Sequence, residues 1–412
     1  MKICVIGLGY IGLPTAAIFS SNGVEVIGVD AKQEVVDTIN KGNIHIEEPG
    51  LGELVKSVVE SGHLKCTTKP VEADAFIICV PTPNLNDQYK SCDLKYVMSA
   101  VDSVVPVLKK GDLIIVESTI APRTMEDEVK PVLESKGFTI GEDLYLAHCP
   151  ERVLPGQILN EMINNNRIIG GITEKCTEKA AELYSKIVKG EIIKTEAKTA
   201  EMSKLVENTY RDVNIAFANE LTQICNELQI NVLDVIQMAN KHPRVNILSP
   251  GPGVGGHCLA VDPYFICSKC PEHSNIISIS RNTNKSMPNF VVAGVDSILQ
   301  EDLSKKILVL GVTYKPNVDD MRESPSYEIA LKLKDKGYNV TIYDPHTKNY
   351  SNVDISDLSA YDLVLCLVSH NEFKEIEVPN DTIVFDVTGS VFNREESVNY
   401  GNLYKYTLKK GR

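Results

Sequence analysis

One cysteine, Cys258, lies behind a run of glycines and four residues ahead of an acid, in the segment Gly251-Pro-Gly-Val-Gly-Gly-His-Cys258-Leu-Ala-Val-Asp262. A thiolate that attacks a carbonyl needs the backbone close by and a setting that favours the charged form, and glycine permits the close approach. The other ten cysteines are expected in ordinary apolar surroundings, where a free cysteine is commonly a small core residue. The pattern favours Cys258 as a covalent nucleophile.

A second group of reactive side chains is spaced for one face of a helix. Lys204, Asn208 and Arg211 stand four and three residues apart, a spacing that brings side chains onto one helix face. Such a stripe is usually solvated. The next turns, residues 213–221, are apolar nearly all round and suggest a buried helix, in which a lysine and an arginine need partners or a ligand.

A glycine-rich turn near the N-terminus predicts a dinucleotide site. Gly7-Leu-Gly9-Tyr10-Ile11-Gly12 follows an apolar strand at 3–6 and opens an apolar helix, and the next strand ends in Asp30. Glycines allow close contact with a pyrophosphate at the helix N-terminus, and an acid about 20 residues on accepts from ribose hydroxyls. A carboxylate also repels a 2′-phosphate, so NAD is expected rather than NADP. The alternative is a glycine turn in an unrelated α/β domain.

Thr82 and Thr119 follow the next two apolar strands, in the segments Val80-Pro-Thr82-Pro and Glu117-Ser-Thr119. Loops at the carboxyl ends of parallel strands line the ligand crevice of such sheets, although each segment alone is as consistent with a plain turn. Cys267-Ser-Lys-Cys270 has no second cysteine or histidine pair at zinc spacing, and His257 and His273 fit no standard site. No metal is predicted.

Alternation of short strands with helical patterns predicts an α/β protein with two Rossmann-like parallel-sheet domains joined by a central helical domain. The boundaries expected are 1–195, 196–302 and 303–412. The expected strands are 3–6, 25–29, 75–80, 113–116, 144–147, 167–169, 307–312, 340–343, 363–368 and 383–387. The expected helices are 199–228, 232–240, 275–300 and 327–336.

The chain has 412 residues, is 43% hydrophobic and 24% charged, and carries a formal charge of −13 without a Lys/Arg cluster. A nucleic-acid partner is therefore not expected, because a phosphate backbone selects basic surfaces. No apolar run reaches the roughly 18 residues that span a bilayer, so no membrane partner is expected. Eleven cysteines scattered through strands and helices fit a reducing cytoplasm better than a disulfide scaffold.

Four segments together resemble the UDP-glucose/GDP-mannose dehydrogenase family over essentially the whole chain. They are GLGYIGLP near the N-terminus, EMSKLVENTYRDVNIAFANE in the helix, GPGVGGHCLAVDPY around Cys258, and GVTYKPNVDDMRESPS in the C-terminal part. The segments Cys149-Pro-Glu151-Arg152 and Asn240-Lys-His242-Pro-Arg244 point to the branch that acts on UDP-N-acetyl-D-mannosamine. Members acting on UDP-glucose carry a second glutamate where this chain has Pro155.

The resemblance implies oxidation of the sugar's primary alcohol to a carboxylate, with two NAD and one water consumed per sugar. Cys258 would carry a thiohemiacetal and then a thioester, Lys204 would stabilise the oxyanion and handle protons, and Asn208 would orient it. Asp262 would assist water or Lys204. Glu151 and Thr119 would position water.

The resemblance also implies where the ligands bind. Arg322 would lie close to NAD, and the expected substrate residues are Arg152, Val153, Lys204, Asn208, Arg211, His242, Arg244, Gly255, Tyr314 and Lys315. Arginine and lysine suit a pyrophosphate because they can neutralise it through several hydrogen bonds. In the family the residue that corresponds to Arg244 comes from a neighbouring subunit, which implies a homodimer or a dimer-based oligomer.

Two other functions share parts of this pattern. A two-electron dehydrogenase of the hydroxyacid kind would use the glycine turn and the Lys/Asn helix, but it would need neither Cys258 nor a third domain. A non-catalytic sensor of NAD or a nucleotide sugar would bind ligands without turnover. Counting NADH per substrate distinguishes the first alternative, and turnover distinguishes the second.

Overall fold

The structure, a computed structural model, describes residues 1–392 and 396–407. It divides into two compact units. Unit 1 comprises residues 1–207 and 264–271, and unit 2 comprises residues 208–263 and 272–412. The predicted fold class is confirmed, with a mostly parallel sheet in each unit and helices between them in the sequence.

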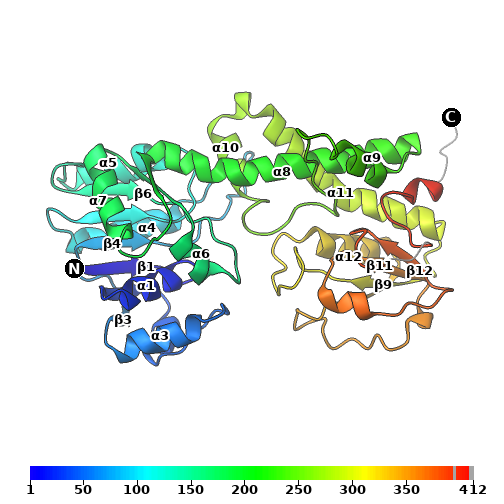
Figure 1. Ribbon diagram of the computed structural model, residues 1–412, viewed down its shortest axis with the longest axis horizontal. Coiled ribbons are helices and arrows are strands. Elements are labelled where there is room, and N and C mark those ends of the chain that lie inside the picture. Colours follow the sequence, from blue (N-terminus) through cyan, green and yellow to red (C-terminus); the bar gives the residue numbers. More distant parts are fainter. Residues whose placement is uncertain (393–395, 408–412) are drawn as a thin grey trace. The chain divides into compact units, whose positions relative to one another are not determined.

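Unit 1 contains an eight-stranded sheet in the order β3-β2-β1-β4-β5-β6-β7-β8 (Figure 1). The strands are β1 (Lys2–Ile6), β2 (Glu25–Val29), β3 (Leu64–Thr67), β4 (Ala75–Ile78), β5 (Leu113–Val116), β6 (Tyr145–His148), β7 (Arg167–Gly171) and β8 (Ile192–Glu196). The helices are α1 (Gly12–Ser21), α2 (Gln33–Asn40), α3 (Leu51–Glu60), α4 (Lys95–Val104), α5 (Lys130–Ser135), α6 (Ile158–Asn164) and α7 (Glu174–Tyr184).

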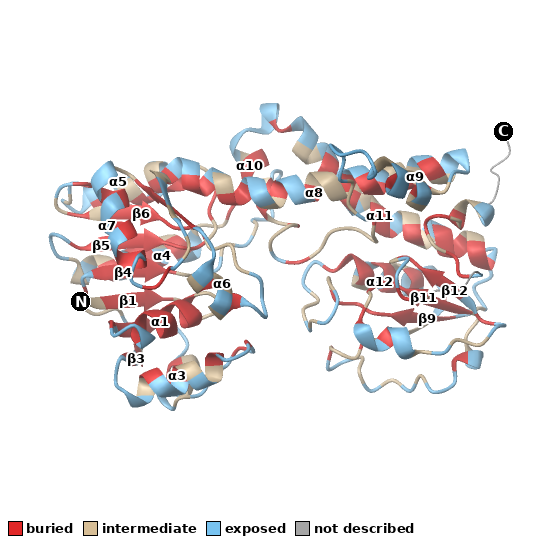
Figure 2. Cartoon of the chain, in the orientation of Figure 1, coloured by how far each residue is buried: buried red, intermediate tan, exposed pale blue. Residues whose placement is uncertain are grey.

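Both faces of this sheet are covered. In β1, Ile3 and Val5 pack into one hydrophobic cluster, whereas Cys4 and Ile6 pack into another. Because successive side chains of a strand point to opposite faces, the two clusters must lie on opposite sides of the sheet. Figure 2 shows the result, with buried strands and helices that are exposed on their outer sides.

One strand runs against expectation. The segment 167–169 was predicted as another parallel strand, but β7 pairs antiparallel with β6, with His148 opposite Gly170. The chain therefore reverses after β6 instead of crossing back to the other end of the sheet. The reversal brings Arg167, the first residue of β7, to the carboxyl end of β6.

Unit 2 contains a four-stranded parallel sheet in the order β10-β9-β11-β12. Its elements are β9 (Lys306–Leu310), β10 (Asn339–Tyr343), β11 (Leu363–Cys366), β12 (Ile383–Asp386), α9 (Val232–Ala239), α11 (Asn275–Leu299) and α12 (Pro325–Lys336). One sheet face, with Ile307 and Val309, packs in a cluster with Met287 and Val291 of α11. Leu308 belongs to a separate cluster on the other face.

The long helix α8 (Ala197–Leu228) and the short helix α10 (Asp262–Lys269) each pass from one unit's residues into the other's. The expectation that residues 213–221 form a buried part of the helix is met on one side only, because Ala216 and Ala218 are buried whereas Phe217 is exposed. Tyr210, Phe217, Ile224 and Leu228 have exposed fractions of 67%, 52%, 45% and 61%. Their spacing of seven, seven and four places them along one side of α8, and this set is called the apolar stripe below.

Candidate active site

The glycine turn of unit 1 has the shape that a dinucleotide requires. Gly7 adopts φ +90°, and a Cβ there would lie 2.6 Å from the Cys79 carbonyl oxygen; a Cβ on Gly12 would lie 1.7 Å from the Gly7 carbonyl oxygen. At Gly9, by contrast, no described atom lies within 4 Å of the Cβ position. Packing therefore accounts for Gly7 and Gly12, whereas the open space at Gly9 fits close approach of a pyrophosphate.

Asp30 follows β2 and points back to this turn. Its Oδ2 accepts a hydrogen bond from the Leu8 amide at 3.1 Å, and its Oδ1 accepts from the Lys32 amide at 3.0 Å. The predicted acid is therefore at the edge of the glycine turn, where a ribose would bind. Tyr10 is exposed and Ile11 is half-buried beside it, so the residues present fit NAD.

The loops after β4 and β5 are joined by Ser118. The Val80 amide donates to Ser118 Oγ at 2.9 Å, and Ser118 Oγ donates to the Val80 carbonyl at 2.7 Å. Thr82 and Thr119, the two threonines predicted to contact NAD, lie in these loops and are half-buried. These two hydrogen bonds hold the two loops together at the carboxyl edge of the sheet.

Glu151 is part of a buried cluster of charges that the sequence did not reveal. Arg167 donates to Glu151 Oε2 at 2.6 Å through one nitrogen and pairs with Glu117 through another. Glu117 also accepts from the Tyr184 hydroxyl, the Thr15 hydroxyl and the Cys79 thiol. Burial raises the pKa of Glu117, whereas four donors on its two oxygens stabilise its carboxylate form.

This cluster corrects the expectation that every cysteine other than Cys258 has apolar surroundings. Cys79 donates to Glu117 at 3.0 Å, and Cys149 Sγ accepts from Arg167 Nε at 3.1 Å. Burial nevertheless raises the pKa of both thiols, so they stay protonated. In the sequence, this cluster was indicated only by a charged residue, Arg167, at the start of an apolar strand.

Lys204 is 6% exposed on α8, near a buried histidine that the sequence analysis did not single out. His148 ends β6, and burial lowers the pKa of its imidazole to about 3, with Lys204 contributing electrostatically in the same direction. Arg152 and Glu207 form an ion pair at 2.6 Å in the same unit. Arg211 departs from expectation because it is exposed, while its neighbour Asp212 is buried.

In unit 2 the Cys258 loop leads directly into α10. The amides of Val261 and Asp262 donate to the Cys258 carbonyl at 3.0 and 2.8 Å. Asp262 Oδ2 in turn accepts from Asn208 Nδ2 at 2.6 Å, so two predicted residues from distant segments are brought together. Cys258 itself is half-buried.

A charged group stands beside the loop. Arg322 interacts electrostatically with Cys258, pairs with Asp320 at 2.7 Å and contacts His257 Nδ1 at 3.0 Å. Burial lowers the pKa of His257, and Arg322 adds to that effect, so the imidazole is neutral near pH 7. Within unit 2, Arg322 is thus a cationic group that favours the Cys258 thiolate.

The remaining predicted substrate residues lie in several parts of the structure. A Cβ on Gly255 would lie 2.4 Å from the Glu323 carbonyl oxygen, so Gly255 lets the Cys258 loop pass close to residues 314–325. The Lys315 ammonium lies 5.8 Å from the centre of the Tyr314 ring. His242 and Arg244 are exposed, and Val153 is half-buried.

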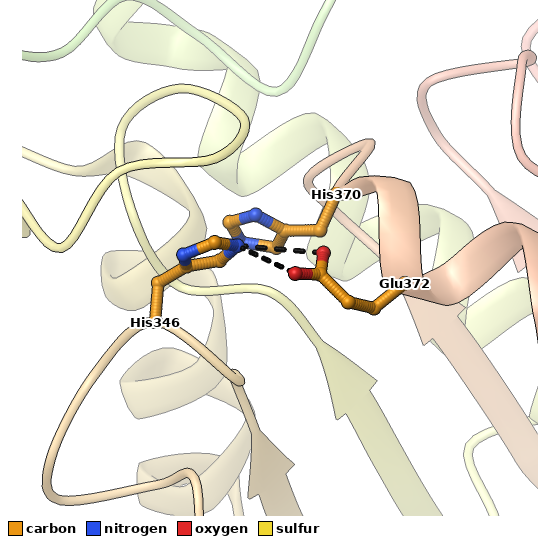
Figure 3. Close-up of side chains that lie close together, drawn as sticks. All are labelled: His346, His370 and Glu372. Carbon is orange, nitrogen blue, oxygen red and sulfur yellow. Dashed lines mark hydrogen bonds and ion pairs between the residues drawn. The ribbon is translucent and has the colours of Figure 1, made fainter. Parts of the chain in front are cut away.

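Three side chains of unit 2, His346, His370 and Glu372, bring possible metal-ligand atoms within 4.8 Å of one another (Figure 3). Both nitrogens of His370 have partners, however. Nδ1 accepts from the Asn317 amide at 2.9 Å, so Nε2 carries the proton and lies 3.2 Å from Asp344 Oδ2. Because His370 offers no lone pair here, the arrangement fits a hydrogen-bonded support at the ends of β10 and β11 better than a metal site.

Sequence models of the UDP-glucose/GDP-mannose dehydrogenase family match the chain in three places: the NAD binding domain at residues 1–188, the central domain at 198–286 and the UDP binding domain at 308–393. Among the described residues, none of the helices has both the length and the apolar character that a membrane crossing requires.

Curated and solved relatives resemble the chain over nearly its whole length. A UDP-N-acetyl-D-mannosamine dehydrogenase of Campylobacter jejuni is 50% identical, over 93% of this chain and 98% of its own. An NDP-N-acetyl-D-galactosaminuronic acid dehydrogenase of Ralstonia nicotianae is 46% identical, over 94% and 95%. The solved UDP-N-acetyl-mannosamine dehydrogenase of S. aureus is 54% identical, with a TM-score of 0.90 over 98% of this chain and 100% of that one.

Proposed function

Because the chain belongs to the UDP-glucose/GDP-mannose dehydrogenase family, we propose that it oxidises UDP-N-acetyl-D-mannosamine at its primary alcohol to the uronate. The structural observation that carries this proposal is the Cys258 loop. It carries a half-buried thiol that interacts electrostatically with the Arg322 guanidinium, and its backbone is connected through Asp262 to Asn208. A dehydrogenase that stops at the aldehyde would have no use for that nucleophile.

NAD, when bound, supplies the hydride acceptor for each of the two oxidations. In the first, Lys204 stabilises the developing oxyanion and handles the proton of the alcohol, with Asn208 as its orienting partner. The Cys258 thiolate then adds to the aldehyde carbon, forming a C–S bond and a thiohemiacetal. Loss of the second hydride leaves a thioester on Cys258. Water then attacks the thioester carbon, so that a C–O bond forms as the C–S bond breaks and the Cys258 thiolate leaves.

Hydrolysis needs an oriented water. We assign the positioning of this water to Glu151 and Thr119, and Asp262 assists either the water or Lys204. The geometry supports a positioning role for Glu151, because Arg167 and the Arg152 amide occupy its two oxygens at 2.6 and 2.7 Å. A carboxylate with both oxygens engaged is held in one orientation. The carboxylate, two NADH and the free thiol are the products.

We assign substrate binding to residues of both units. Tyr314 and Lys315 lie in the loop that follows β9 and suit a nucleotide diphosphate, and Arg322 is assigned to NAD. The other residues assigned to the sugar nucleotide are Arg152, Val153, Lys204, Asn208, Arg211, His242, Arg244 and Gly255. His242 and Arg244, both exposed, follow α9 in the segment 240–244.

We also propose that the enzyme is a homodimer in the cytoplasm. The apolar stripe of α8 supports the dimer, because four large side chains on one side of a helix have exposed fractions of 45% or more. In such a dimer, the exposed Arg244 would contact the substrate that is bound to the partner subunit. The proposed cytoplasmic location is supported by eleven cysteines that are all free thiols in the structure.

Purified protein, NAD and a panel of UDP- and GDP-sugars test the proposal. We expect turnover with UDP-N-acetyl-D-mannosamine, two NADH per sugar measured by absorbance, and a uronate identified by mass spectrometry. One NADH per sugar with an aldehyde product would contradict four-electron oxidation. Binding without turnover across the panel would support the sensor instead.

Replacing the nucleophile tests the covalent step. We expect Cys258→Ser to abolish acid formation, because an alkoxide ester is a poorer intermediate than a thioester. The measurement is uronate formed per enzyme, with Cys270→Ser as the control because Cys270 is exposed and lies outside the loop. Normal acid formation by Cys258→Ser would sink the mechanism.

A further inference from the structure

Two buried polar side chains on α8, Asp212 and Asn219, have no part in the proposed chemistry. Asn208, Asp212 and Asn219 are spaced by four and seven residues, which puts them on one face of the helix. Asp212 and Asn219 are fully buried. Buried polar groups are retained where they have defined partners, so the partners indicate what this face does.

The partner of Asn219 is the first glycine of the Cys258 loop. Asn219 Oδ1 accepts from the Gly251 amide at 2.9 Å, and the Tyr400 hydroxyl donates to the Gly251 carbonyl at 3.0 Å. Both backbone polar groups of Gly251 are therefore held by side chains. Tyr400 is itself fixed by packing, with ring centres 6.0 Å from Phe290 and 6.4 Å from Phe385.

The orientation of the Asn219 amide is set from deeper in unit 2. Asn284 Nδ2 donates to Asp212 Oδ1 at 2.8 Å and to the Asp212 carbonyl at 3.0 Å. Asn284 must then turn its oxygen toward Asn219 Nδ2, at 2.9 Å, which leaves the Asn219 oxygen facing Gly251. Arg281 pairs with Asp212 and completes the series.

The backbone of α11 at Asn284 also lies close to the Cys258 loop. Pro288 lies inside α11 and has no amide proton to donate to the Asn284 carbonyl, four residues earlier. Gly253 has φ +132°, and a Cβ there would lie 3.0 Å from that carbonyl oxygen. Farther along, the Gly256 amide donates to the Arg322 carbonyl at 3.0 Å, and Asp262 accepts from Asn208. Contacts therefore fix the loop at both ends.

We propose that Asp212, Asn219 and Asn284 are positioning residues that hold the Cys258 loop in one conformation through Gly251. The proposal rests on the proposed role of Cys258 as the nucleophile. A directional series of hydrogen bonds starts at the buried Asp212–Arg281 pair and ends on the loop backbone, seven residues before the thiol. Small displacements of a reacting atom are costly, so this series would set the rate of thiol addition.

Two variants of the full-length enzyme each remove one of the side-chain hydrogen bonds to the backbone of Gly251. Asn219→Leu keeps the branched shape of the side chain but loses both hydrogen bonds, and Tyr400→Phe loses only the hydroxyl. We expect kcat to fall about 10- to 100-fold for Asn219→Leu and by a smaller factor for Tyr400→Phe. The KM for NAD should not change, because the altered hydrogen bonds to Gly251 involve neither the glycine turn of unit 1 nor Arg322.

A second measurement does not depend on the sugar. Iodoacetamide labelling of Cys258, followed by mass spectrometry of its peptide across pH, reports the thiol directly. In both variants we expect the half-maximal pH to move upward, because the thiolate loses its fixed place near Arg322. Thr222→Val is the matched control, since the buried Thr222 hydroxyl donates within α8 to the Ala218 carbonyl, and it should label like the wild type.

The outcomes separate this proposal from the proposed function. Wild-type labelling and kcat in folded Tyr400→Phe and Asn219→Leu would overturn the positioning role, as would an equal shift in Thr222→Val. If Asn219→Leu does not fold, Tyr400→Phe decides alone, because its ring packing is retained. Acid formation by Cys258→Ser would instead remove the function that the loop is proposed to serve.

Discussion

At the scale of single residues, the proposed chemistry depends on how a few charges are held. Glu151 is fixed by Arg167, which also pairs with the fully buried Glu117. Removing one partner of such a pair typically costs about 3–5 kcal/mol, because the other charge is left uncompensated. Cys258, in contrast, is half-buried and interacts electrostatically with the Arg322 guanidinium, which suits a group that must become charged and then react.

Lys204 offers the most direct test at this scale. We expect Lys204→Ala to lower kcat about 100-fold or more, the range of a lost general acid–base, while the Kd for NAD changes less than about twofold. Steady-state kinetics and calorimetric titration with NAD give the two numbers. Lys198→Ala is the control, because Lys198 stands on the same helix in exposed ion pairs with Glu126 and Glu196. Equal losses in kcat and NAD affinity would argue for a structural role.

At the scale of elements, α8 carries residues of several proposed roles. Its beginning is tied to unit 1 by Glu201, whose carboxylate accepts from the amides of Arg123 and Met125 at 2.6 and 2.8 Å. Farther along, one side holds the Cys258 loop through Asn219, and another side presents the apolar stripe. The residues proposed for catalysis and for positioning thus share one face of α8, and those proposed for assembly lie on another side.

Glu201 predicts a pH dependence of stability. Burial raises the pKa of Glu201 from 4.5 to about 7, so the folded chain holds this proton more tightly than the unfolded chain. Its contribution is complete below about pH 4.5 and is lost as pH rises through about 7, on the order of 3 kcal/mol in all. Urea unfolding of wild type and Glu201→Gln across this window should show wild type losing stability relative to the variant. Parallel curves would contradict the assignment.

Much of the arrangement of elements could be predicted from the sequence. Strands at 25–29 and 113–116 were predicted at their observed bounds, and α8 begins two residues before its predicted start, because hydrophobic periodicity marks such elements well. The site was less predictable. Arg167 reaches Glu151 only because β7 runs antiparallel, and periodicity does not report strand direction. Asp212 rather than Arg211 is buried, because adjacent helix residues differ by about 100° and packing chooses the side.

At the scale of the whole molecule, the chain combines two mostly parallel sheets that differ in the residues at the end of the first strand. Unit 1 has the glycine turn and Asp30, whereas in unit 2 the corresponding strand end is engaged by Asp344, whose Oδ2 accepts from the amides of Val312 and Thr313. The division into domains at 195/196 and 302/303 stays a prediction. The residues proposed for catalysis come from both units.

The apolar stripe predicts the assembly. We expect the wild type to sediment at twice the mass of one chain, and Phe217→Glu with Leu228→Glu to sediment as a single chain, because two carboxylates cannot be buried without partners. Leu331→Glu, an exposed apolar position on α12, is the control and should stay dimeric. If Arg244 acts across the interface, the stripe variant also loses activity. A wild-type monomer with full turnover would refute the dimer.

Asp30 has a further consequence for redesign of the enzyme. Its carboxylate both faces the expected ribose and accepts the Leu8 amide within the glycine turn. Cofactor preference and the shape of the turn are therefore coupled in one side chain. An engineer who seeks acceptance of a phosphorylated cofactor should choose asparagine over alanine there, since the amide removes the repelling charge but keeps an oxygen for the backbone.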